Sequence, residues 1–234
     1  MTFIRYYLDV SCGAKLQGIS HNLNNFVHVL NMQLTLLDSI LVRKPEIPLG
    51  EQAKKIKNLG QGTQKLARAI EVMTQRNFYL QEEIVSTSPG EFLSWLSDFW
   101  QNDLFFKHNI NCHLDCASDV PVLELPAFAL TFCVEQPLTN AVEAYRIKDP
   151  DGKHDLEIKV SAYKKGIELQ IISNTDLTLQ EPWQPWQTTK PGHLGLGLTL
   201  IHFLISRLNW SASLYCQNGV TRFSLQIGER KSFF

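Results

Sequence analysis

The stretch from Lys15 to Val42 reads KLQGISHNLNNFVHVLNMQLTLLDSILV and contains no proline. Four leucines recur in it every seven residues, and a second, mostly apolar set recurs with the same period, offset by three. The two sets are Leu16, Leu23, Leu30 and Leu37, and Ile19, Phe26, Gln33 and Ile40. This spacing gathers both sets on one face of an α-helix. The stretch therefore predicts a long helix that buries one face in a helical bundle.

The same heptad pattern places His21 on the side of the helix that is farthest from the apolar face. His28 occupies the equivalent position one heptad later. A histidine at an exposed helical position is most often only a solvated surface residue. We therefore expect His21 to be accessible to a partner protein, and its role depends on what the rest of the sequence supplies.

A second helical pattern covers residues 49–80. Its repeating positions are Ile56, Thr63, Ile70 and Asn77, together with Leu59, Leu66, Met73 and Leu80. Pro45 and Pro48 end the first helix, because proline cannot continue it, so the two helices form an antiparallel hairpin. One hairpin cannot bury both apolar stripes, and we expect a homodimer with a four-helix bundle. Residues 1–14 are too few for a sensor domain and are expected to extend or cap the first helix.

The pattern changes after Gln81, where alternating segments typical of strands mix with helical segments. The expected strands are 84–85, 110–116, 156–160, 167–171, 212–216 and 220–227, and the expected helices are 89–107, 126–146 and 194–208. Residues 175–193 contain three prolines and are expected to form a long loop, which in a compact domain is often functional. We predict an α+β protein: a helical hairpin, residues 1–81, then an α/β sandwich, residues 82–234, with a mixed, mainly antiparallel sheet.

The composition excludes several classes of function. The 234-residue chain has a net charge of −1, so no basic excess favours a nucleic-acid partner. Its apolar runs are too short or too interrupted to predict a membrane span. Its five cysteines have no paired metal-ligand spacing. We expect a cytoplasmic protein with ordinary thiols.

Three segments of the second part carry groups suited to a phosphorylated ligand. Asn140 lies on a predicted helix, where its carboxamide oxygen can coordinate a hard cation. Thr188, Thr189 and Lys190 offer two hydroxyls and a cation to an anion. Residues 192–198, Gly-His-Leu-Gly-Leu-Gly-Leu, head a predicted helix, where backbone amides can approach phosphates. Each segment alone is weak evidence, but their order on helix, loop and helix is specific.

With these segments, the chain resembles the transmitter core of bacterial sensor histidine kinases over about residues 14–228. Residues 20–25 resemble the H box, residues 136–144 the N box, residues 183–192 the F box and lid, and residues 195–198 the second glycine box. Trp186 stands where the family usually has phenylalanine. The last two boxes carry most of the resemblance, because the H box alone is not specific.

The resemblance implies a protein kinase that uses ATP and Mg²⁺. His21 would accept the γ-phosphoryl group of ATP and pass it to an aspartate on the receiver domain of a response regulator. Asn140 would bind the Mg²⁺, and Asn25 matches the family position that orients water for dephosphorylation of the regulator. The implied catalytic residues are His21, Asn22 and Asn25, and the implied ATP-binding residues are Asn140, Glu143, Asn174, Asp176, Thr188, Thr189, Lys190, Gly192, Gly195, Leu196 and Gly197. Input is expected from a separate sensor protein.

Three positions depart from the family pattern. Asn22 replaces an acidic residue and cannot act as a base. Residues 173–176, Ser-Asn-Thr-Asp, stand where an aspartate usually accepts a hydrogen bond from adenine, so Asn174 or Asp176 is a candidate substitute. Gln136 replaces the first asparagine of the N box. These changes keep open a degenerate histidine phosphotransfer protein or regulator-binding scaffold that binds no ATP. An ATPase or serine kinase with the same ATP-binding fold is disfavoured by the helical hairpin.

Overall fold

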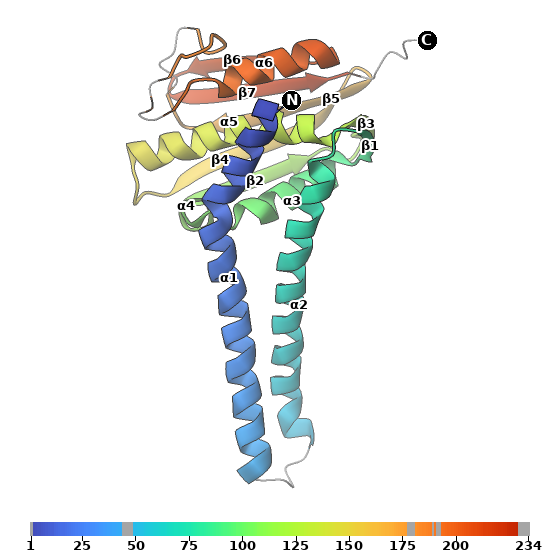
Figure 1. Cartoon of the computed structure of the whole chain (residues 1–234), viewed down its shortest axis with the longest axis vertical. Helices are drawn as coiled ribbons and strands as arrows, with labels where there is room; N and C mark the ends of the chain where they lie inside the picture. Colours follow the sequence, from blue (N-terminus) through green and yellow to red (C-terminus); the bar gives the residue numbers. More distant parts are fainter. Residues whose placement is uncertain (1, 44–48, 177–180, 189, 191–192, 229–234) are drawn as a thin grey trace.

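The computed structural model describes residues 2–43, 49–176, 181–188, 190 and 193–228. Two long antiparallel helices, α1 (Thr2–Arg43) and α2 (Leu49–Tyr79), project as a hairpin from an α/β domain (Figure 1). The predicted hairpin is confirmed, and residues 2–14 extend its first helix. The predicted turn at Pro45 and Pro48 lies outside the described residues.

The seam between the two helices follows most of the predicted heptad positions. Leu23, Phe26 and Leu30 are partly buried there. Gly62 lets the helices approach, because a Cβ at this position would lie 2.8 Å from Leu30 Cδ2. Leu16 differs from the prediction and is 55% exposed. Near Leu16, α1 packs against the α/β domain, where Lys15 contacts Trp100 and Gly18 meets Asn102, so a different face of the helix turns inward.

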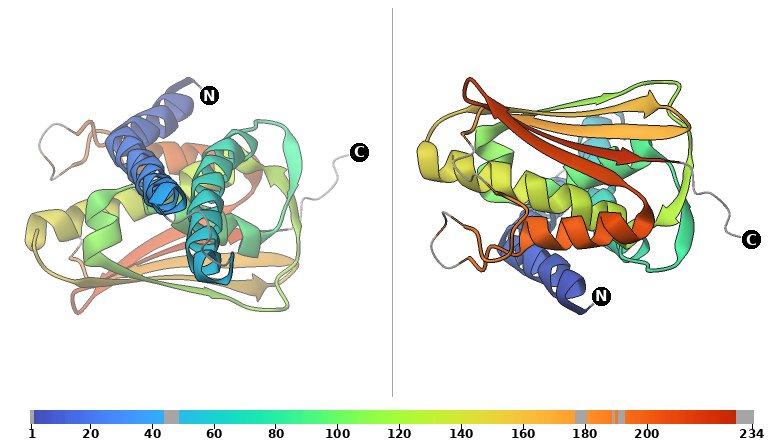
Figure 2. Two further views of the ribbon diagram at one scale, coloured as in Figure 1. Left: turned by 90° about the horizontal axis from the view of Figure 1, so that it is seen from below. Right: turned by 90° about the horizontal axis from the view of Figure 1, so that it is seen from above.

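The α/β domain is built on a five-stranded sheet with the order β2-β4-β5-β7-β6. The strands are β2 (Ile110–Cys116), β4 (His154–Tyr163), β5 (Gly166–Ser173), β6 (Ser211–Gln217) and β7 (Val220–Ile227). The helices are α3 (Pro89–Trp100), α4 (Leu104–Asn109), α5 (Ala127–Lys148) and α6 (Gly197–Leu208), and they lie on one side of this sheet (Figure 2). Only β2 and β4 pair in parallel, which confirms the predicted mixed, mainly antiparallel sheet.

Two details of the domain differ from the sequence prediction. The single helix expected at 89–107 is two helices, because the side chain of Asp103 accepts a hydrogen bond from Phe106 N at 2.9 Å and caps the start of α4. A strand that was not predicted, β3 (Leu123–Pro126), pairs with β1 (Ile84–Thr87) in a second, two-stranded sheet. This segment lies between Pro121 and Pro126, and prolines argue against a strand in a sequence prediction.

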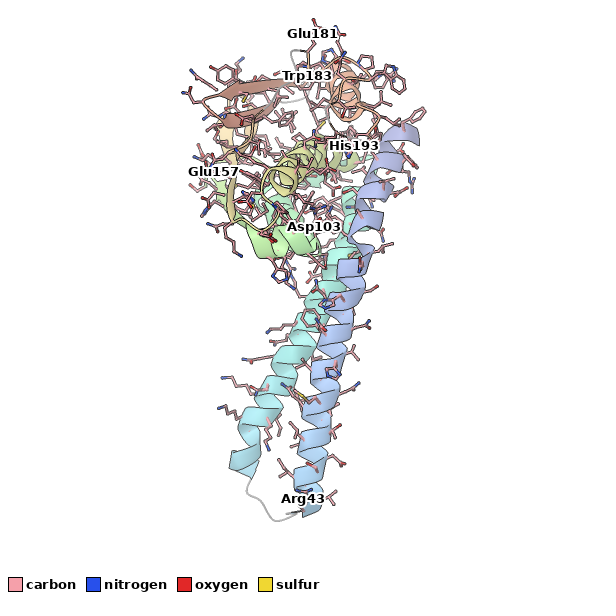
Figure 3. The ribbon with its side chains drawn as sticks, turned by 90° about the vertical axis from the view of Figure 1, so that its left-hand side faces the viewer. Arg43, Asp103, Glu157, Glu181, Trp183 and His193 are labelled. Carbon is pink, nitrogen blue, oxygen red and sulfur yellow. The ribbon has the colours of Figure 1, made fainter. Side chains whose placement is uncertain are left out.

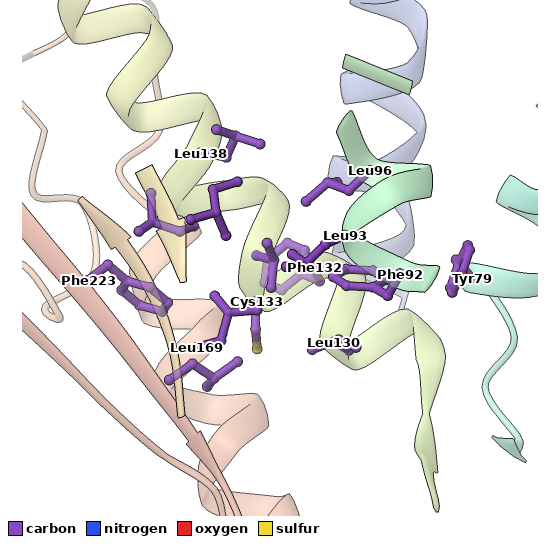
Figure 4. Packing of buried hydrophobic residues seen from close by; sticks show 14 of the residues in the cluster. Tyr79, Phe92, Leu93, Leu96, Leu130, Phe132, Cys133, Leu138, Leu169 and Phe223 are labelled. Carbon is purple, nitrogen blue, oxygen red and sulfur yellow. The ribbon is translucent and has the colours of Figure 1, made fainter. Parts of the chain in front are cut away.

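The hydrophobic core joins the hairpin to the domain. Figure 4 shows Phe92 of α3 between Phe132 of α5 and Tyr79 of α2. Ile4 and Leu8 of α1 belong to the same buried cluster. The two predicted domains therefore share one core at the upper end of the hairpin.

A buried polar cluster lies at the same junction. Arg76 of α2 forms an ion pair with Glu135 of α5 at 2.9 Å, and their side chains are 5% and 0% exposed. Arg76 Nη2 also donates to the carbonyl of Leu8 at 2.6 Å. Lys15 lies beside this pair, with Nζ 3.7 Å from the centre of the Trp100 ring. Burial lowers the pKa of Lys15. These contacts link α1, α2 and α5 to one another.

Helix α1 is also relevant to the predicted absence of a membrane span. Part of Phe3–Arg43 is long and apolar enough to cross a membrane by length and composition alone. A helix near an N-terminus can have this length and composition without crossing a membrane. The absence of a span therefore stays a prediction.

Candidate functional site

A cavity of about 390 Å³ opens between α5, the segment that precedes α6, and the sheet. This volume lies in the usual range of small-ligand sites, roughly 300–1,000 Å³. Figure 3 shows Trp183 and His193, two residues of the segment that precedes α6, near the upper part of the domain. The cavity brings together residues from all three segments that the sequence suggested for a phosphorylated ligand.

The start of α6 forms one side of the cavity. Gly195 has a φ of 64°, and a Cβ there would lie 2.6 Å from the carbonyl oxygen of Gln187, so this position requires glycine. A Cβ at Gly197 would lie 2.6 Å from Gln136 Oε1. The N-cap residue, Leu196, makes no side-chain hydrogen bond to the helix. The first amides of α6 are therefore suited to an anion.

Lys190 connects this segment to α5. Its Nζ lies 2.6 Å from Glu143 Oε2 and 3.1 Å from Asn140 Oδ1. His193 Nε2 lies 3.8 Å from the other carboxylate oxygen of Glu143. Thr188 Oγ1 accepts a hydrogen bond from the backbone N of Lys190 at 3.0 Å. The predicted helix and loop residues are thus adjacent in space. Two further predicted residues, Thr189 and Gly192, lie outside the described residues.

The oxygen atoms around Lys190 also suit a divalent cation. Asn140 Oδ1 and the Glu143 carboxylate both contact the same ammonium group, so they present oxygen to one point. Mg²⁺ prefers oxygen ligands and is usually held by one or two side chains together with substrate phosphates. Among the described residues, no group of three or more His, Cys, Asp and Glu side chains could hold a metal alone.

Hydroxyl groups dominate the polar surface on the sheet side of the cavity. Ser173 Oγ and Thr175 Oγ1 lie 2.8 Å apart, and both residues are buried. Thr221 of β7 donates its hydroxyl hydrogen to the carbonyl of Thr175 at 2.6 Å. The sequence prediction placed Ser173 and Thr175 in the adenine segment without choosing either as a binding residue, and it missed Thr221. The signal was present in β5, because the alternation of its inward residues continues to Ser173.

The two predicted adenine-binding residues, Asn174 and Asp176, are both exposed. Asn174 is exposed, and its backbone N donates to the Tyr145 hydroxyl at 2.6 Å. Asp176 lines the cavity, but its side chain is 63% exposed and lies 3.9 Å from Lys148 Nζ. Asp176 therefore lies at the solvent-exposed edge of the cavity. Asn174 does not continue the series of inward-facing residues in β5.

Tyr7 brings α1 to the cavity wall, which the sequence gave no reason to expect. Its ring meets Phe132 of α5 edge to face, with centroids 6.3 Å apart. Burial raises the pKa of Tyr7, with a smaller contribution from Tyr6. The helix that carries His21 thus also contributes to the cavity.

His21 itself is exposed on α1, as predicted from the heptad pattern. One turn later, Asn25 Nδ2 lies 3.2 Å from His21 Nδ1 and 3.4 Å from His21 Nε2. The predicted pair of His21 and Asn25 is therefore in contact. Each nitrogen of the ring can meet the amide, depending on the tautomer.

Asn22 contacts the α/β domain. Its Nδ2 donates to Asn102 Oδ1 at 3.0 Å, and its Oδ1 accepts from Lys107 Nζ at 3.0 Å. Gly18, one turn earlier, permits this approach, because a Cβ there would lie 1.8 Å from the Asn102 carbonyl oxygen. In this arrangement Asn22 holds the domain against α1.

No protein-family model matches the chain, and no curated protein sequence matches it. Solved histidine kinase structures do match. The Acinetobacter baumannii histidine kinase AdeS aligns over 90% of this chain and 98% of its own, at 15% identity and a TM-score of 0.52. Histidine kinase ThkA, in complex with response regulator TrrA, aligns over 98% of this chain and 67% of its own, at 14% identity and 0.52.

Full-length ShkA in complex with AMPPNP aligns over 90% of this chain and 45% of its own, at 12% identity and a TM-score of 0.52. At sequence identities of 12–15%, the similarity to these structures shows the fold alone. The chain therefore has the fold of a histidine kinase core, in which a helical hairpin is followed by an α/β domain.

Proposed function

We propose that the chain is a protein histidine kinase of two-component signalling, which phosphorylates His21 from ATP and passes the phosphoryl group to a response regulator. The observation that carries this proposal is the meeting of Lys190, Asn140 and the uncapped start of α6 around one cavity. A cation and helical amides at one end, with an apolar far side, suit a nucleoside triphosphate.

The chemistry asks little of the protein beyond position and charge. A neutral imidazole nitrogen of His21 attacks the γ-phosphorus, the bond from phosphorus to the ADP oxygen breaks, and the imidazole proton is released. Lys190 and the amides of α6 stabilise charge on the phosphates, and Mg²⁺ neutralises part of that charge when it is bound. Asn25, which contacts the His21 ring, would orient a water molecule, so dephosphorylation of the regulator is part of the proposal.

The same proposal includes a homodimer. Val27, Leu34 and Leu41 form an exposed apolar stripe on α1, and Ile56 and Ile70 are exposed on α2. A second hairpin would cover these side chains in a four-helix bundle. A second copy of the hairpin fits this stripe because the stripe has the same heptad period as the seam between α1 and α2.

A cytoplasmic location and a separate sensor protein complete the proposal. None of the five cysteines forms a disulfide, which suits a reducing compartment. The response-regulator partner follows from the chemistry of an exposed phosphohistidine, which transfers its group to an aspartate. ThkA, whose core this chain resembles in fold, was solved with such a regulator.

A second candidate is a phosphotransfer protein or regulator-binding scaffold that binds no ATP. The buried residues on the sheet side of the cavity favour it, because Ser173 and Thr175 are uncharged and Asp176 faces solvent. Asn22, engaged by Asn102 and Lys107, favours it as well. Calorimetry with ATP separates the two candidates.

The test of the kinase is incubation with Mg²⁺ and γ-labelled ATP. Wild type, His21→Ala and the matched control His28→Ala are compared, since His28 occupies the same heptad position one repeat later. We expect label that is stable to alkali, labile to acid and lost only in His21→Ala. Absence of both label and ATP binding would sink the kinase and support the scaffold.

A further inference from the structure

The sheet side of the cavity combines an apolar strip with a cluster of hydroxyls. In the sheet, Ile171 pairs with Phe223, and Phe223 pairs with Leu214 of the neighbouring strand. One step further, Ser173 pairs with Thr221. All five residues line the cavity. A flat ring that lies along this strip would meet hydroxyls at its end.

The proposed nucleotide can enter this cavity in one orientation. Its phosphates belong beside Lys190 and the start of α6, where the positive charge and the amides are. Its base is then directed to the sheet side, where Ile171 and Phe223 supply apolar surface. The edge of the base therefore faces Ser173, Thr175 and Thr221.

The hydroxyl hydrogens of Ser173, Thr175 and Thr221 decide which hydrogen bonds this cluster can form with a base. Thr221 commits its hydroxyl hydrogen to the carbonyl of Thr175. Ser173 and Thr175 share one hydrogen between their oxygens, and either of them can be the donor. One hydrogen of this pair is left, together with oxygen lone pairs, so the pair can donate or accept.

A carboxylate would behave differently, because it only accepts hydrogen bonds. Among the described residues that line the cavity, Asp176 is the one acidic side chain, and it is 63% exposed beside Lys148. It therefore contributes little selectivity at the buried end.

We propose that this site does not discriminate between adenine and guanine, and that it binds ATP and GTP with similar affinity. The proposal rests on the proposed function of the cavity as a nucleotide site. Adenine presents an exocyclic amino donor where guanine presents a carbonyl acceptor. A hydroxyl pair with one uncommitted hydrogen can meet either group, so Ser173 and Thr175 determine a relaxed base specificity.

The experiment is calorimetry of the full chain with the non-hydrolysable analogues AMPPNP and GMPPNP in the presence of Mg²⁺. We expect the two dissociation constants of the wild type to agree within about tenfold, which corresponds to about 1.4 kcal/mol. Ser173→Asp places an acceptor-only group at the same point, and we expect it to shift the ratio at least about tenfold toward AMPPNP. Ser213→Asp, on the exposed side of β6, is the matched control for added charge and should leave the ratio unchanged.

Each outcome decides the question. A wild-type difference of more than about tenfold between the two analogues, in either direction, overturns the relaxed specificity but leaves the kinase standing. Binding of neither analogue overturns both the specificity and the proposed function. An unchanged ratio in a folded Ser173→Asp overturns the assignment of Ser173 to the base. The wild-type ratio decides the proposal even where Ser173→Asp does not fold.

Discussion

The upper and lower ends of α1 differ in what covers their apolar side chains. At the upper end Ile4, Leu8 and Ile19 are buried, and even Lys15 is only 3% exposed. At the lower end Leu34 is 52% exposed, although it lies on the same helix. The α/β domain of the same chain covers the upper end, whereas at the lower end we propose that a second copy does.

The contacts at the upper end of α1 also restrict which residues can be present, and those at the lower end do so much less. Arg76 must reach Glu135 and the Leu8 carbonyl at once, and Gly18 must leave room for the Asn102 carbonyl. The exposed apolar stripe of the lower hairpin, Val27, Leu34 and Leu41, requires only apolar side chains at the right spacing. Substitutions should therefore affect folding at the upper end and association at the lower end.

The largest effect on the free energy of unfolding is expected from Arg76→Ala. This change leaves Glu135 buried without its partner, which typically costs about 3–5 kcal/mol of unfolding free energy. Arg68→Ala is the matched control, because Arg68 pairs with Glu71 and Asp98 in exposed positions, and its loss should cost at most about 1 kcal/mol. Urea denaturation measures both. Equal losses in the two variants would refute the distinction between the buried and exposed pairs.

At the lower end, Leu34→Glu should weaken dimerisation without unfolding the chain. A buried leucine contributes roughly 1.5–3 kcal/mol, and the symmetric dimer loses two, so the dissociation constant should rise at least about 100-fold. Thr35→Glu adds the same charge at the outward heptad position of His28 and should have little effect. Light scattering across concentrations provides the readout. A wild type that stays monomeric, or binds lipid vesicles instead, would contradict the second copy as occupant.

An intermediate effect is expected from Gly18→Ala. The added methyl group meets the Asn102 carbonyl, and such overpacking costs about 1–3 kcal/mol. Gly13→Ala is an ideal comparison on the same helix, because a Cβ there meets nothing within 4 Å. Alanine favours a helix over glycine by up to about 1 kcal/mol, so Gly13→Ala should stabilise the chain. Thermal unfolding of both variants should move in opposite directions, and a shared direction would argue against close docking at Gly18.

The smallest effect concerns Lys15 and pH. Burial lowers the pKa of Lys15 in the folded chain, whereas the unfolded chain keeps a pKa near ~10.4. At pH values between these two pKa values, the unfolded state binds more protons than the folded state. The contribution of Lys15 should therefore make the free energy of unfolding rise with pH. Cys112, whose pKa burial raises to about 11, acts in the opposite direction. The difference between wild type and Lys15→Met isolates the lysine, and parallel pH profiles would show that Lys15 does not contribute.

Much of the fold could be predicted because its signals are local. The heptad pattern predicted the hairpin, and the alternation of apolar and polar residues predicted β4, β5, β6 and β7. The inward position of Ser173 was within reach of the same rule, because Leu169 and Ile171 already set the inward face of β5. The split between α3 and α4 depended on one capping residue, Asp103, inside an otherwise helical pattern.

The docking of α1 could not be predicted in the same way. Contacts of Leu8 with Arg76 and of Tyr7 with the cavity join residues far apart in the chain, and no period encodes them. One signal was Gly18, the only glycine between Lys15 and Val42, one turn before His21. Only the position of Asn102 in space explains why a glycine is needed there.

The continuity of α1 separates the proposed phosphoacceptor from the part of the cavity wall that this helix forms. Tyr7 and His21 are fourteen residues apart on this unbroken helix, which corresponds to about 21 Å along its axis. A reacting nucleophile must approach to about 3 Å. In a dimer whose two-fold axis follows the bundle, the partner's His21 lies at the same height, so the second copy does not shorten the path. On the proposed function, His21 reacts only while the upper end of α1 is detached from the domain, and each 1.4 kcal/mol of docking energy lowers that population about tenfold.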